Sequence, residues 1–168
     1  MLRKVLSHRI ETREVIKINI QKARFEDLED ILELQQTAYL SEAELYKEIV
    51  IPPLIQTLSD IQEKYITSVF YKMVSHSKII GSVRVSYSND TCHINKLCVH
   101  PRHQGQGIGR LMMREMENVM DCKRFELFTG HRSTRNLSFY ESMGYKRFKQ
   151  EPLNEALTLI YMEKFKDK

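Results

Sequence analysis

Hydrophobic and polar residues alternate with two different periods along the chain. Within Val15–Lys22, Ile16, Ile18 and Ile20 occupy every second position, and this period of two predicts a β-strand. Elsewhere apolar residues recur every three or four positions, which is typical of an amphipathic helix. Together with short apolar runs, the pattern predicts strands at Val15–Lys22, Ile66–Val74, Lys78–Tyr87, Thr91–Val99, Lys123–Thr129, Tyr145–Gln150 and Ala156–Lys164.

Helices are expected between these strands. Their predicted starts are Glu26, Pro52, Gly107 or Ile108, and Thr134. Their predicted buried faces are Leu28, Ile31, Leu32 and Gln35; then Leu54, Leu58, Ile61 and Tyr65; then Ile108, Leu111, Met112, Met116 and Val119. The last helix, Thr134–Met143, is expected to end at Gly144, because glycine suits a left-handed C-cap. Ser41 and Glu44 have the spacing of a capping box, which predicts one further short turn.

The order of these elements is β-αα-βββ-α-β-α-ββ, with a predicted hairpin turn at Ser75–Ser77 and a second turn at Ser88–Asp90. This order predicts an α/β (α+β) fold in which helices cover both faces of one central, mixed, mostly antiparallel sheet of about seven strands. We expect one domain over residues 15–168. The basic segment at residues 1–14 is interpreted as a frayed arm or an upstream extension.

Composition narrows the class of protein. The hydrophobic share of 42% and the charged share of 29% are typical of a soluble globular domain, and no apolar run approaches the roughly 20 residues that span a bilayer. Three cysteines, placed in expected strands or at a helix end, favour a reducing, cytoplasmic location over a disulfide framework. A net charge of +4, without a basic helix, gives no reason to expect nucleic acid as a partner.

The most informative segment is the turn after the predicted strand Thr91–Val99. Gly105, Gly107 and Gly109 lie at alternate positions, where the missing Cβ atoms let a ligand approach the backbone. The helix that follows begins with unpaired N–H groups and a partial positive charge. The turn therefore suits a diphosphate, and the nearby Arg110 adds a positive charge.

The glycine turn does not fit the patterns of two other phosphate-binding loops. A Walker loop ends in Gly-Lys-Ser/Thr, whereas Gly109 is followed by Arg110 and Leu111. A dinucleotide fingerprint needs a glycine spacing one residue longer, in an early βαβ unit, and this turn comes late in the chain. A turn without any function is the remaining alternative.

Two motifs resemble those of the GNAT superfamily of N-acetyltransferases. Gln104–Gly109 matches the family's Gln/Arg-x-x-Gly-x-Gly/Ala loop, and Leu97, Val99 and Pro101 match its Leu-x-Val-x-Pro lead-in. Asn136–Tyr145 is similar to the second family motif, although Ser138–Tyr140 lies closer to Asn136 than in some members. With the order of elements, the resemblance covers about Ile16 to Lys164.

The resemblance implies an enzyme that transfers the acetyl group of acetyl-CoA to an amine. The backbone of Leu97, Cys98 and Val99 would pair with the pantetheine arm, as a peptide adds to a sheet edge. The pyrophosphate would be held by Gln104, Gly105, Gln106, Gly107, Ile108, Gly109 and Arg110. Asn136 would hydrogen-bond the cofactor arm, and Tyr140 would protonate the leaving thiolate. The alternative for Tyr140 is an aromatic residue of the core.

The resemblance leaves the catalytic base open. Many family members carry glutamate on the strand before the Leu-x-Val segment, where this chain has Asn95, and asparagine cannot accept a proton. Candidates for the role are Glu42, Glu44, His93 or a chain of waters, and Glu44 is named here. Glu44 could equally cap its turn, and His93 could face solvent.

The cysteine and histidine residues near the turn have a simpler interpretation. Cys98, His100 and His103 suggest a metal site by spacing, but no fourth ligand is evident, so no metal is expected. Cys98 is also considered as an acyl-accepting nucleophile, although the family usually transfers the acetyl group directly.

The acceptor is expected to lie against Thr37–Pro53, which in this family forms part of the pocket wall. Tyr39, Tyr46, Glu42 and Glu44 indicate an aromatic, acidic pocket, which favours a small amine or a polyamine. A protein N-terminus, a lysine side chain and an antibiotic amine remain alternatives. So does a non-catalytic acyl-CoA sensor of the same fold. A homodimer, common in the family, is also considered.

Overall fold

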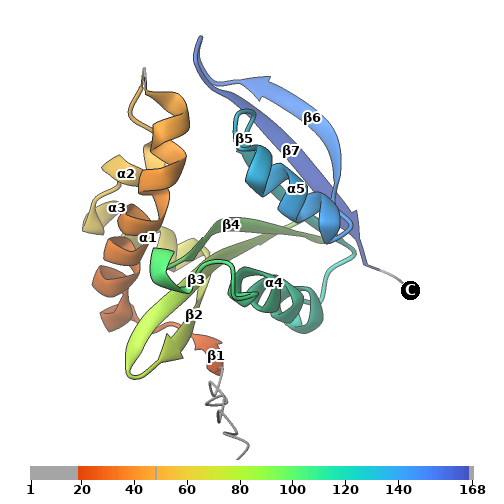
Figure 1. Cartoon of the computed structure of the whole chain (residues 1–168). Helices are drawn as coiled ribbons and strands as arrows, with labels where there is room; N and C mark the ends of the chain where they lie inside the picture. The colour runs from red at the N-terminus through yellow and green to blue at the C-terminus, as the bar shows by residue number, and fades with distance from the viewer. Residues whose placement is uncertain (1–18, 48, 167–168) are drawn as a thin grey trace, which may run out of the picture.

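A computed structural model describes residues 19–47 and 49–166. Within these residues one sheet contains strands in the order β1-β2-β3-β4-β5-β7-β6 (Figure 1). The strands are β1 Asn19–Lys22, β2 Val69–Ser75, β3 Lys78–Ser88, β4 Thr91–Val99, β5 Arg124–Gly130, β6 Lys146–Pro152 and β7 Thr158–Phe165. β4 and β5 are parallel, and the other neighbouring pairs are antiparallel. The expected mixed, mostly antiparallel sheet is confirmed. The expected extension at residues 1–14 and the start of the first strand lie outside the described residues.

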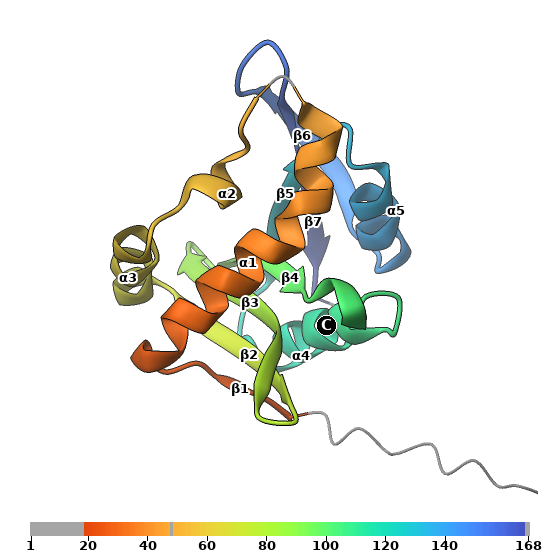
Figure 2. The same ribbon diagram turned by 60° about the vertical axis from the view of Figure 1, so that its left-hand side comes forward.

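Helices cover both faces of the sheet, as expected (Figures 1 and 2). They are α1 Leu28–Ala43, α2 Pro52–Ile55, α3 Leu58–Thr67, α4 Ile108–Val119 and α5 Thr134–Ser142, with 3-10 turns at Phe25–Asp27, Glu44–Tyr46 and Pro101–His103. Ile31 of α1 and Ile61 of α3 share a hydrophobic cluster with Phe70 of β2. Met112 of α4 and Leu137 of α5 belong to the larger cluster on the other side. The two helical layers therefore have separate cores.

β4 and β5 separate soon after they meet, and this separation positions the site. Their pairing extends only from Thr91–His93 to Arg124–Glu126. Beyond these residues the two strands diverge (Figure 1). The register of β4 against β3 also shifts between Ser82 and Arg84, and Lys96 at this bulge has a φ of +51°. Bulges bend a strand and redirect its side chains. The second half of β4 thus presents a free edge towards β5.

The second predicted helix is two helices, so this prediction was wrong. α2 ends at Ile55, and Thr57 then caps α3: its Oγ1 accepts a 3.2 Å hydrogen bond from the Asp60 N–H, while the Asp60 carboxylate accepts one of 2.7 Å from the Thr57 N–H. This capping box starts a new helix inside a continuous apolar pattern. Ile66, predicted to begin a strand, lies in α3 and is 83% exposed.

Three smaller predictions about the helices can be compared with the structure. Ser41 lies inside α1, because nothing in the sequence stops the helix before Ala43, so the predicted capping box with Glu44 is wrong. Leu111 and Val119 are 38% and 46% exposed, because α4 turns the side chains of 108, 112, 113 and 116 inwards. Gly144 has a φ of +91°, which confirms the expected left-handed end of α5.

Candidate active site

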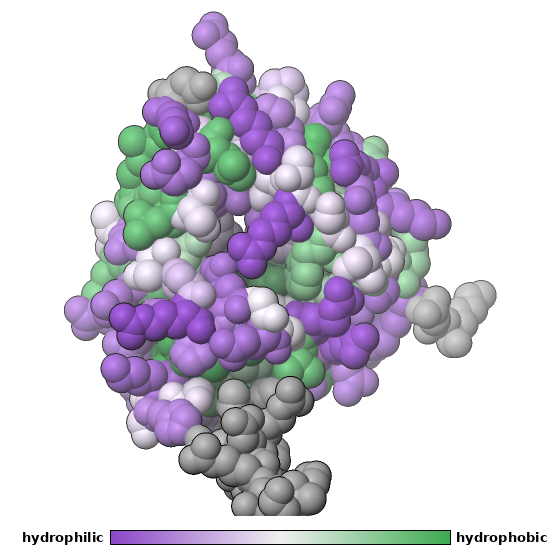
Figure 3. Space-filling view, in the orientation of Figure 1, coloured by the Kyte–Doolittle hydropathy of each residue, from purple (hydrophilic) through white to green (hydrophobic). Residues whose placement is uncertain are grey.

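A cavity of about 810 Å³ opens where β4 and β5 separate. Its walls come from the end of α1, the start of α2, the second half of β4, the glycine turn, the end of β5 and the start of α5. Figure 3 shows the surface hollowed between the α1 side and the α5 side of the molecule, with hydrophilic and neutral side chains around the hollow. Elements far apart in the sequence thus meet around one space.

The glycine turn forms one end of this cavity. Gly105 and Gly107 have φ values of +74° and +82°, and a Cβ atom added to either would meet nothing within 4 Å. Both positions need glycine for their backbone conformation and leave the backbone open to a ligand. In the described part of the chain, the amides of residues 105–110 have no hydrogen-bond acceptor. These donors at the start of α4 suit an anion.

Gly109 differs from the other two glycines. Its φ is ordinary, and an added Cβ would lie 3.6 Å from Cζ of Phe139, an ordinary van der Waals distance. Gly109 also lines the cavity, but neither its backbone conformation nor the space around it requires a glycine. The sequence alone did not separate this position from the other two glycines.

Polar side chains fasten the turn to its neighbours. Gln104 Nε2 donates a 2.9 Å hydrogen bond to the Val99 carbonyl, and Arg135 donates one of 3.2 Å to Gln104 Oε1. Gln106 Nε2 donates to the Arg102 carbonyl at 3.2 Å. These bonds fix the direction in which the turn leaves β4.

Arg110, expected to face phosphate, contacts α5 in this structure. Its guanidinium donates a 2.7 Å hydrogen bond to Ser142 Oγ and lies 5.7 Å from the centre of the Phe139 ring. Arg110 is also part of the cavity lining, together with Ile108. The positive charge is thus held beside the free amides of the turn.

The free edge of β4 borders the same cavity. Leu97, Cys98 and Val99 all line it, as expected. The His100 N–H donates a 2.8 Å hydrogen bond to the Ile80 carbonyl on β3. Neighbouring N–H groups of a strand point to opposite edges, so the Val99 N–H points to the open edge. An extended chain with amide groups could pair with β4 there.

Tyr140 of α5 lines the same cavity. The residue is 9% exposed, and its hydroxyl makes no hydrogen bond within the described residues. Burial above all, then Glu42 and Cys98, raises the pKa of Tyr140 well above its ordinary value. Burial likewise raises the pKa of the Cys98 thiol to about 12. At neutral pH both groups keep their protons, which suits a proton donor and does not suit a nucleophilic thiolate.

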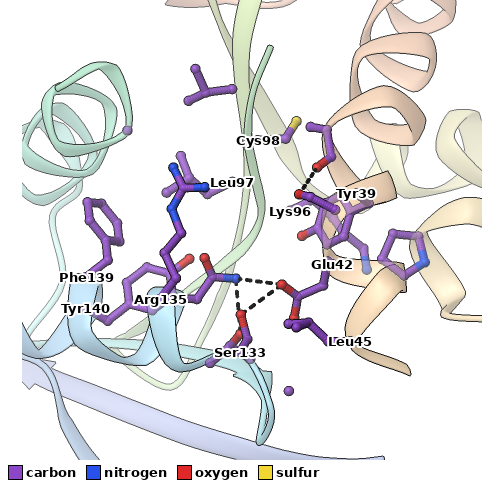
Figure 4. Close-up of a pocket in the computed structure, with 18 of the residues that line it drawn as sticks. Tyr39, Glu42, Leu45, Lys96, Leu97, Cys98, Ser133, Arg135, Phe139 and Tyr140 are labelled. Carbon is purple, nitrogen blue, oxygen red and sulfur yellow. Dashed lines mark hydrogen bonds between the residues drawn. The ribbon is translucent and has the colours of Figure 1, made fainter. Parts of the chain in front are cut away.

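Glu42 is the carboxylate of this cavity, and polar contacts hold it in place (Figure 4). Its Oε2 accepts a 2.8 Å hydrogen bond from Ser133 Oγ and one of 3.4 Å from Asn136 Nδ2. Asn136 also donates to Thr129 Oγ1 at 3.5 Å. Burial raises the pKa of Glu42, while the Ser133 hydrogen bond acts in the opposite direction. Asn136, expected to contact the cofactor arm, thus contacts Glu42 in this structure.

The other base candidates lie away from the cavity. Glu44 is exposed and does not belong to the cavity lining. His93 Nε2 is 2.8 Å from Ser88 Oγ, and its Nδ1 is 3.6 Å from Glu126. Asn95 donates to the His93 carbonyl at 3.3 Å. Among Glu42, Glu44 and His93, the structure brings only Glu42 to the cavity.

Both aromatic residues of the expected acceptor wall line the cavity, but Tyr46 is almost completely buried. Tyr39 lines the cavity opposite Tyr140 (Figure 4). Tyr46 is 1% exposed, and its hydroxyl accepts a 2.9 Å hydrogen bond from the Arg132 N–H. Its ring packs over Gly130, where a Cβ would collide with it. Tyr46 therefore shapes the wall from behind.

Sequence reasoning missed Lys96, Arg84 and Ser133. Lys96 lines the cavity, and its Nζ lies 5.7 Å from the centre of the Tyr39 ring. Burial, and then the charge of Arg84, lowers the pKa of Lys96 to about 8. A lysine on an expected strand gives no signal of its own, because the bulge that turns it inwards depends on the register with β3.

The described residues were also compared with the sequence expectations on metal ions, cysteines and membrane spans. Across residues 19–47 and 49–166, no group of three His, Cys, Asp or Glu side chains is placed to hold a metal ion. Cys92, Cys98 and Cys122 are all free and buried. None of the helices in the described ranges combines the length and the apolar character needed to cross a bilayer.

A family model matches the part of the chain that carries the site. Residues 67–147 match the model of the acetyltransferase (GNAT) domain. This segment includes β4, the glycine turn and α5, which together carry most of the site. Over this segment, just under half of the chain, the sequence matches the GNAT superfamily, and the resemblance seen in its motifs is confirmed.

Individual proteins match this chain at low sequence identity. The UPF0157 protein YqkA of Bacillus subtilis is 27% identical over 131 residues, which cover 77% of this chain and 38% of YqkA. The chain likewise spans 57% of the length of YyaT from the same organism, at 22% identity over 51% of this chain. The chain therefore spans less than two thirds of the length of each of these relatives.

Solved structures share the fold over nearly the whole chain. The PaiA N-acetyltransferase of Thermoplasma acidophilum, in complex with coenzyme A, has a TM-score of 0.71 and 20% identity, covering 88% of this chain and 98% of its own. The ribosomal-protein-S18-alanine N-acetyltransferase of Escherichia coli has a TM-score of 0.72 and 15% identity, covering 90% and 95%. These likenesses establish a common fold.

Proposed function

We propose that the chain transfers the acetyl group of acetyl-CoA to a primary amine. One observation carries the proposal: unpaired amides at the glycine turn, the free edge of β4 and the Tyr140 hydroxyl all border a single cavity. Coenzyme A has a pyrophosphate at one end, two amides in its arm and a thiol at the other end. The PaiA structure with coenzyme A has the same fold, which supports this choice of co-substrate.

The residues fit the successive parts of acetyl-CoA. The amides of Gly105–Arg110 would hold the pyrophosphate. Gly105 and Gly107 have no Cβ atom, so the space beside these amides is free for it. The pantetheine amides would pair with the open edge of Leu97–Val99. Gln104 and Gln106 would support the turn through their bonds to neighbouring carbonyls.

The chemistry requires a neutral amine, an oxyanion donor and an acid. The amine nitrogen attacks the thioester carbonyl, a C–N bond forms, and the C–S bond then breaks. The Val99 N–H would stabilise the oxyanion, and Tyr140 would protonate the leaving thiolate. The proton of the amine would go to Glu42, which takes the role expected of Glu44 because it lies in the cavity. Its raised pKa makes it a better base than an ordinary carboxylate.

The acceptor is proposed to be a small amine. Tyr39 and Glu42 favour a cationic amine, as expected from the sequence. A polyamine is the less favoured small acceptor, since Lys96 places a positive charge in the same cavity. A protein N-terminus or lysine is the alternative acceptor. A homodimer and a cytoplasmic location stay predictions.

A panel of amines with acetyl-CoA tests this function. Mass spectrometry should detect an acetylated product from at least one small amine, together with released thiol. Thiol release without acetylated product would mean hydrolysis only. Binding of acetyl-CoA without any product across small amines, peptides and polyamines would instead support the sensor, the second candidate. No heat of binding with acetyl-CoA would refute both.

A further inference from the structure

Arg84 on β3 and Lys96 on β4 are neighbouring cations, the first buried and the second partly buried. Among the described residues, neither forms an ion pair with a carboxylate. Arg84 of β3 is 8% exposed and pairs across the sheet with Asn95, the residue before Lys96. Within the described residues neither side chain has an ion pair or hydrogen bond; Lys96 contacts the Tyr39 ring, and Arg84 lies 5.7 Å from the Phe70 ring centre. The NH1 atom of Arg84 is buried without a partner.

Lys72, another buried cation of this sheet, has the carboxylate partner that Arg84 and Lys96 lack. Lys72 of β2 is buried, and its Nζ lies 2.6 Å from the Asp27 carboxylate. A buried charge without such a partner is strongly destabilising, because its lost hydration is not replaced. The repulsion between Arg84 and Lys96 adds to this cost, and burial followed by Arg84 lowers the pKa of Lys96 to about 8. A lysine with this pKa is still mostly protonated at neutral pH.

The position of Lys96 places this charge at the acceptor end of the cavity. Lys96 comes directly before Leu97–Val99, on the side away from the glycine turn. Tyr39, which its ammonium contacts, lies three residues before Glu42 on α1, and residues at this spacing share a helix face about 5 to 6 Å apart. In Figure 4 Tyr39, Glu42 and Lys96 lie on one wall, and Phe139 and Tyr140 lie on the opposite wall.

We propose that Lys96, with Arg84 behind it, binds a carboxylate of the acceptor, so that the preferred substrate is an amino acid or a similar amine with an acid group nearby. The amine would lie near Glu42 and Tyr140, while the carboxylate would neutralise the two cations. This inference rests on the proposed acetyl transfer. A carboxylate fits both partners, because ammonium and guanidinium groups bind it through charged hydrogen bonds.

Matched acceptor pairs test the proposal. Each of a panel of amino acids is compared with its own amide, which keeps the amine and the side chain but lacks the charge. With acetyl-CoA, kcat/KM for the acid should exceed that for the amide by about tenfold or more for the best amino acid. In Lys96→Met this ratio should fall towards one, and Lys96→Arg should retain most of it. The control Lys78→Met removes an exposed lysine of the β2–β3 hairpin and should keep the ratio.

A second measurement does not depend on turnover. N-acetylated amino acids carry the carboxylate of the product, and they should raise the melting temperature of the wild-type protein more than the corresponding amides do. Lys96→Met and Arg84→Met should lose this difference. Without ligand, Lys96→Met should melt at or above the wild-type temperature, because it removes an unpaired buried charge.

Several results would overturn the inference while leaving the proposed function intact. Acids and amides acetylated equally well by the wild type would do so, as would an unchanged preference in Lys96→Met. Turnover of amides with succinyl-CoA but not with acetyl-CoA would mean that the cations bind the acyl group of the donor. If no amine is acetylated, the proposed function fails, and the melting experiment still decides whether Lys96 binds a carboxylate.

Discussion

Ser133 Oγ donates a 2.8 Å hydrogen bond to the Glu42 carboxylate, across a sequence separation of 91 residues. The bond joins the end of α1 to the residue that precedes α5, and Ser133 itself is 1% exposed. The contact fixes the carboxylate on the cavity wall and stabilises its charged form. It also links the two sides of the opening between β4 and β5.

The first prediction concerns the pH dependence of this pair. As the base, Glu42 must be ionised, so kcat/KM should rise with pH through the raised pKa of Glu42. Ser133→Ala removes a hydrogen bond that lowers this pKa, so the rise should move to higher pH. Glu42→Gln should remove most activity at every pH. Profiles of kcat/KM against pH with one amine measure both effects, and Glu33→Gln, which changes an exposed carboxylate on the same helix outside the cavity, should leave the profile in place.

The second prediction separates chemistry from cofactor binding at Tyr140. Tyr140→Phe keeps the ring in its buried site and removes the proton donor. Turnover should fall by about 100-fold, while the Kd for acetyl-CoA stays within about twofold of the wild-type value. Stopped assays and calorimetry measure the two quantities. Tyr161→Phe on β7 is the matched control, and equal turnover in Tyr140→Phe would exclude the role as acid.

The third prediction compares two glycines of the turn. Gly107→Ala places a Cβ at a φ of +82° and in the open space proposed for phosphate, so affinity for coenzyme A should fall about tenfold or more. Gly109→Ala has an ordinary φ and meets Phe139 only at van der Waals distance, so affinity should change little. Calorimetric titration with coenzyme A compares the two variants. Equal losses would mean that strain in α4, rather than blocked phosphate, controls binding.

Much of the fold was predictable, because its signals are local. Alternating residues such as those around Ile20 and helix-ending signals such as Gly144 act within a few positions. The break between α2 and α3 was missed, although Thr57 and Asp60 carry the capping signal, because the apolar pattern continues through it. The bulge at Lys96 could not be predicted, since it depends on how β4 pairs with β3.

In the candidate site, too, the residues in short motifs could be predicted, whereas those that depend on the folded structure could not. The glycine turn and Tyr140 belong to short motifs, and the structure brings both to one cavity. The choice between Glu42 and Glu44 depends on where α1 ends and which of its sides faces the cavity. Although they are only two residues apart, Glu42 lies in the cavity and Glu44 in solvent. Ser133 comes next to Glu42 only when the whole chain has folded.

The fourth prediction concerns the buried pair of Asp27 and Lys72. Burial alone would raise the pKa of Asp27, but the hydrogen bonds from Lys72 and from the Arg24 N–H outweigh it, and the pKa is lowered from 3.8. Because the folded pKa is below the unfolded one, the pair contributes stability above the unfolded pKa, and this contribution is lost as pH falls through the folded value.

Asp27→Asn should therefore lower the free energy of unfolding by about 3 kcal/mol or more at pH 7, since it leaves Lys72 buried and uncompensated. The loss should shrink only below pH 3.8, as pH falls through the lowered pKa of Asp27 and the wild-type carboxylate also becomes neutral. Urea unfolding at several pH values measures this difference. Asp90→Asn removes a partner of the exposed Lys123 and should cost far less than Asp27→Asn, because water screens exposed ion pairs. A loss for Asp27→Asn that does not change with pH would mean that packing, rather than charge, sets the stability of this site.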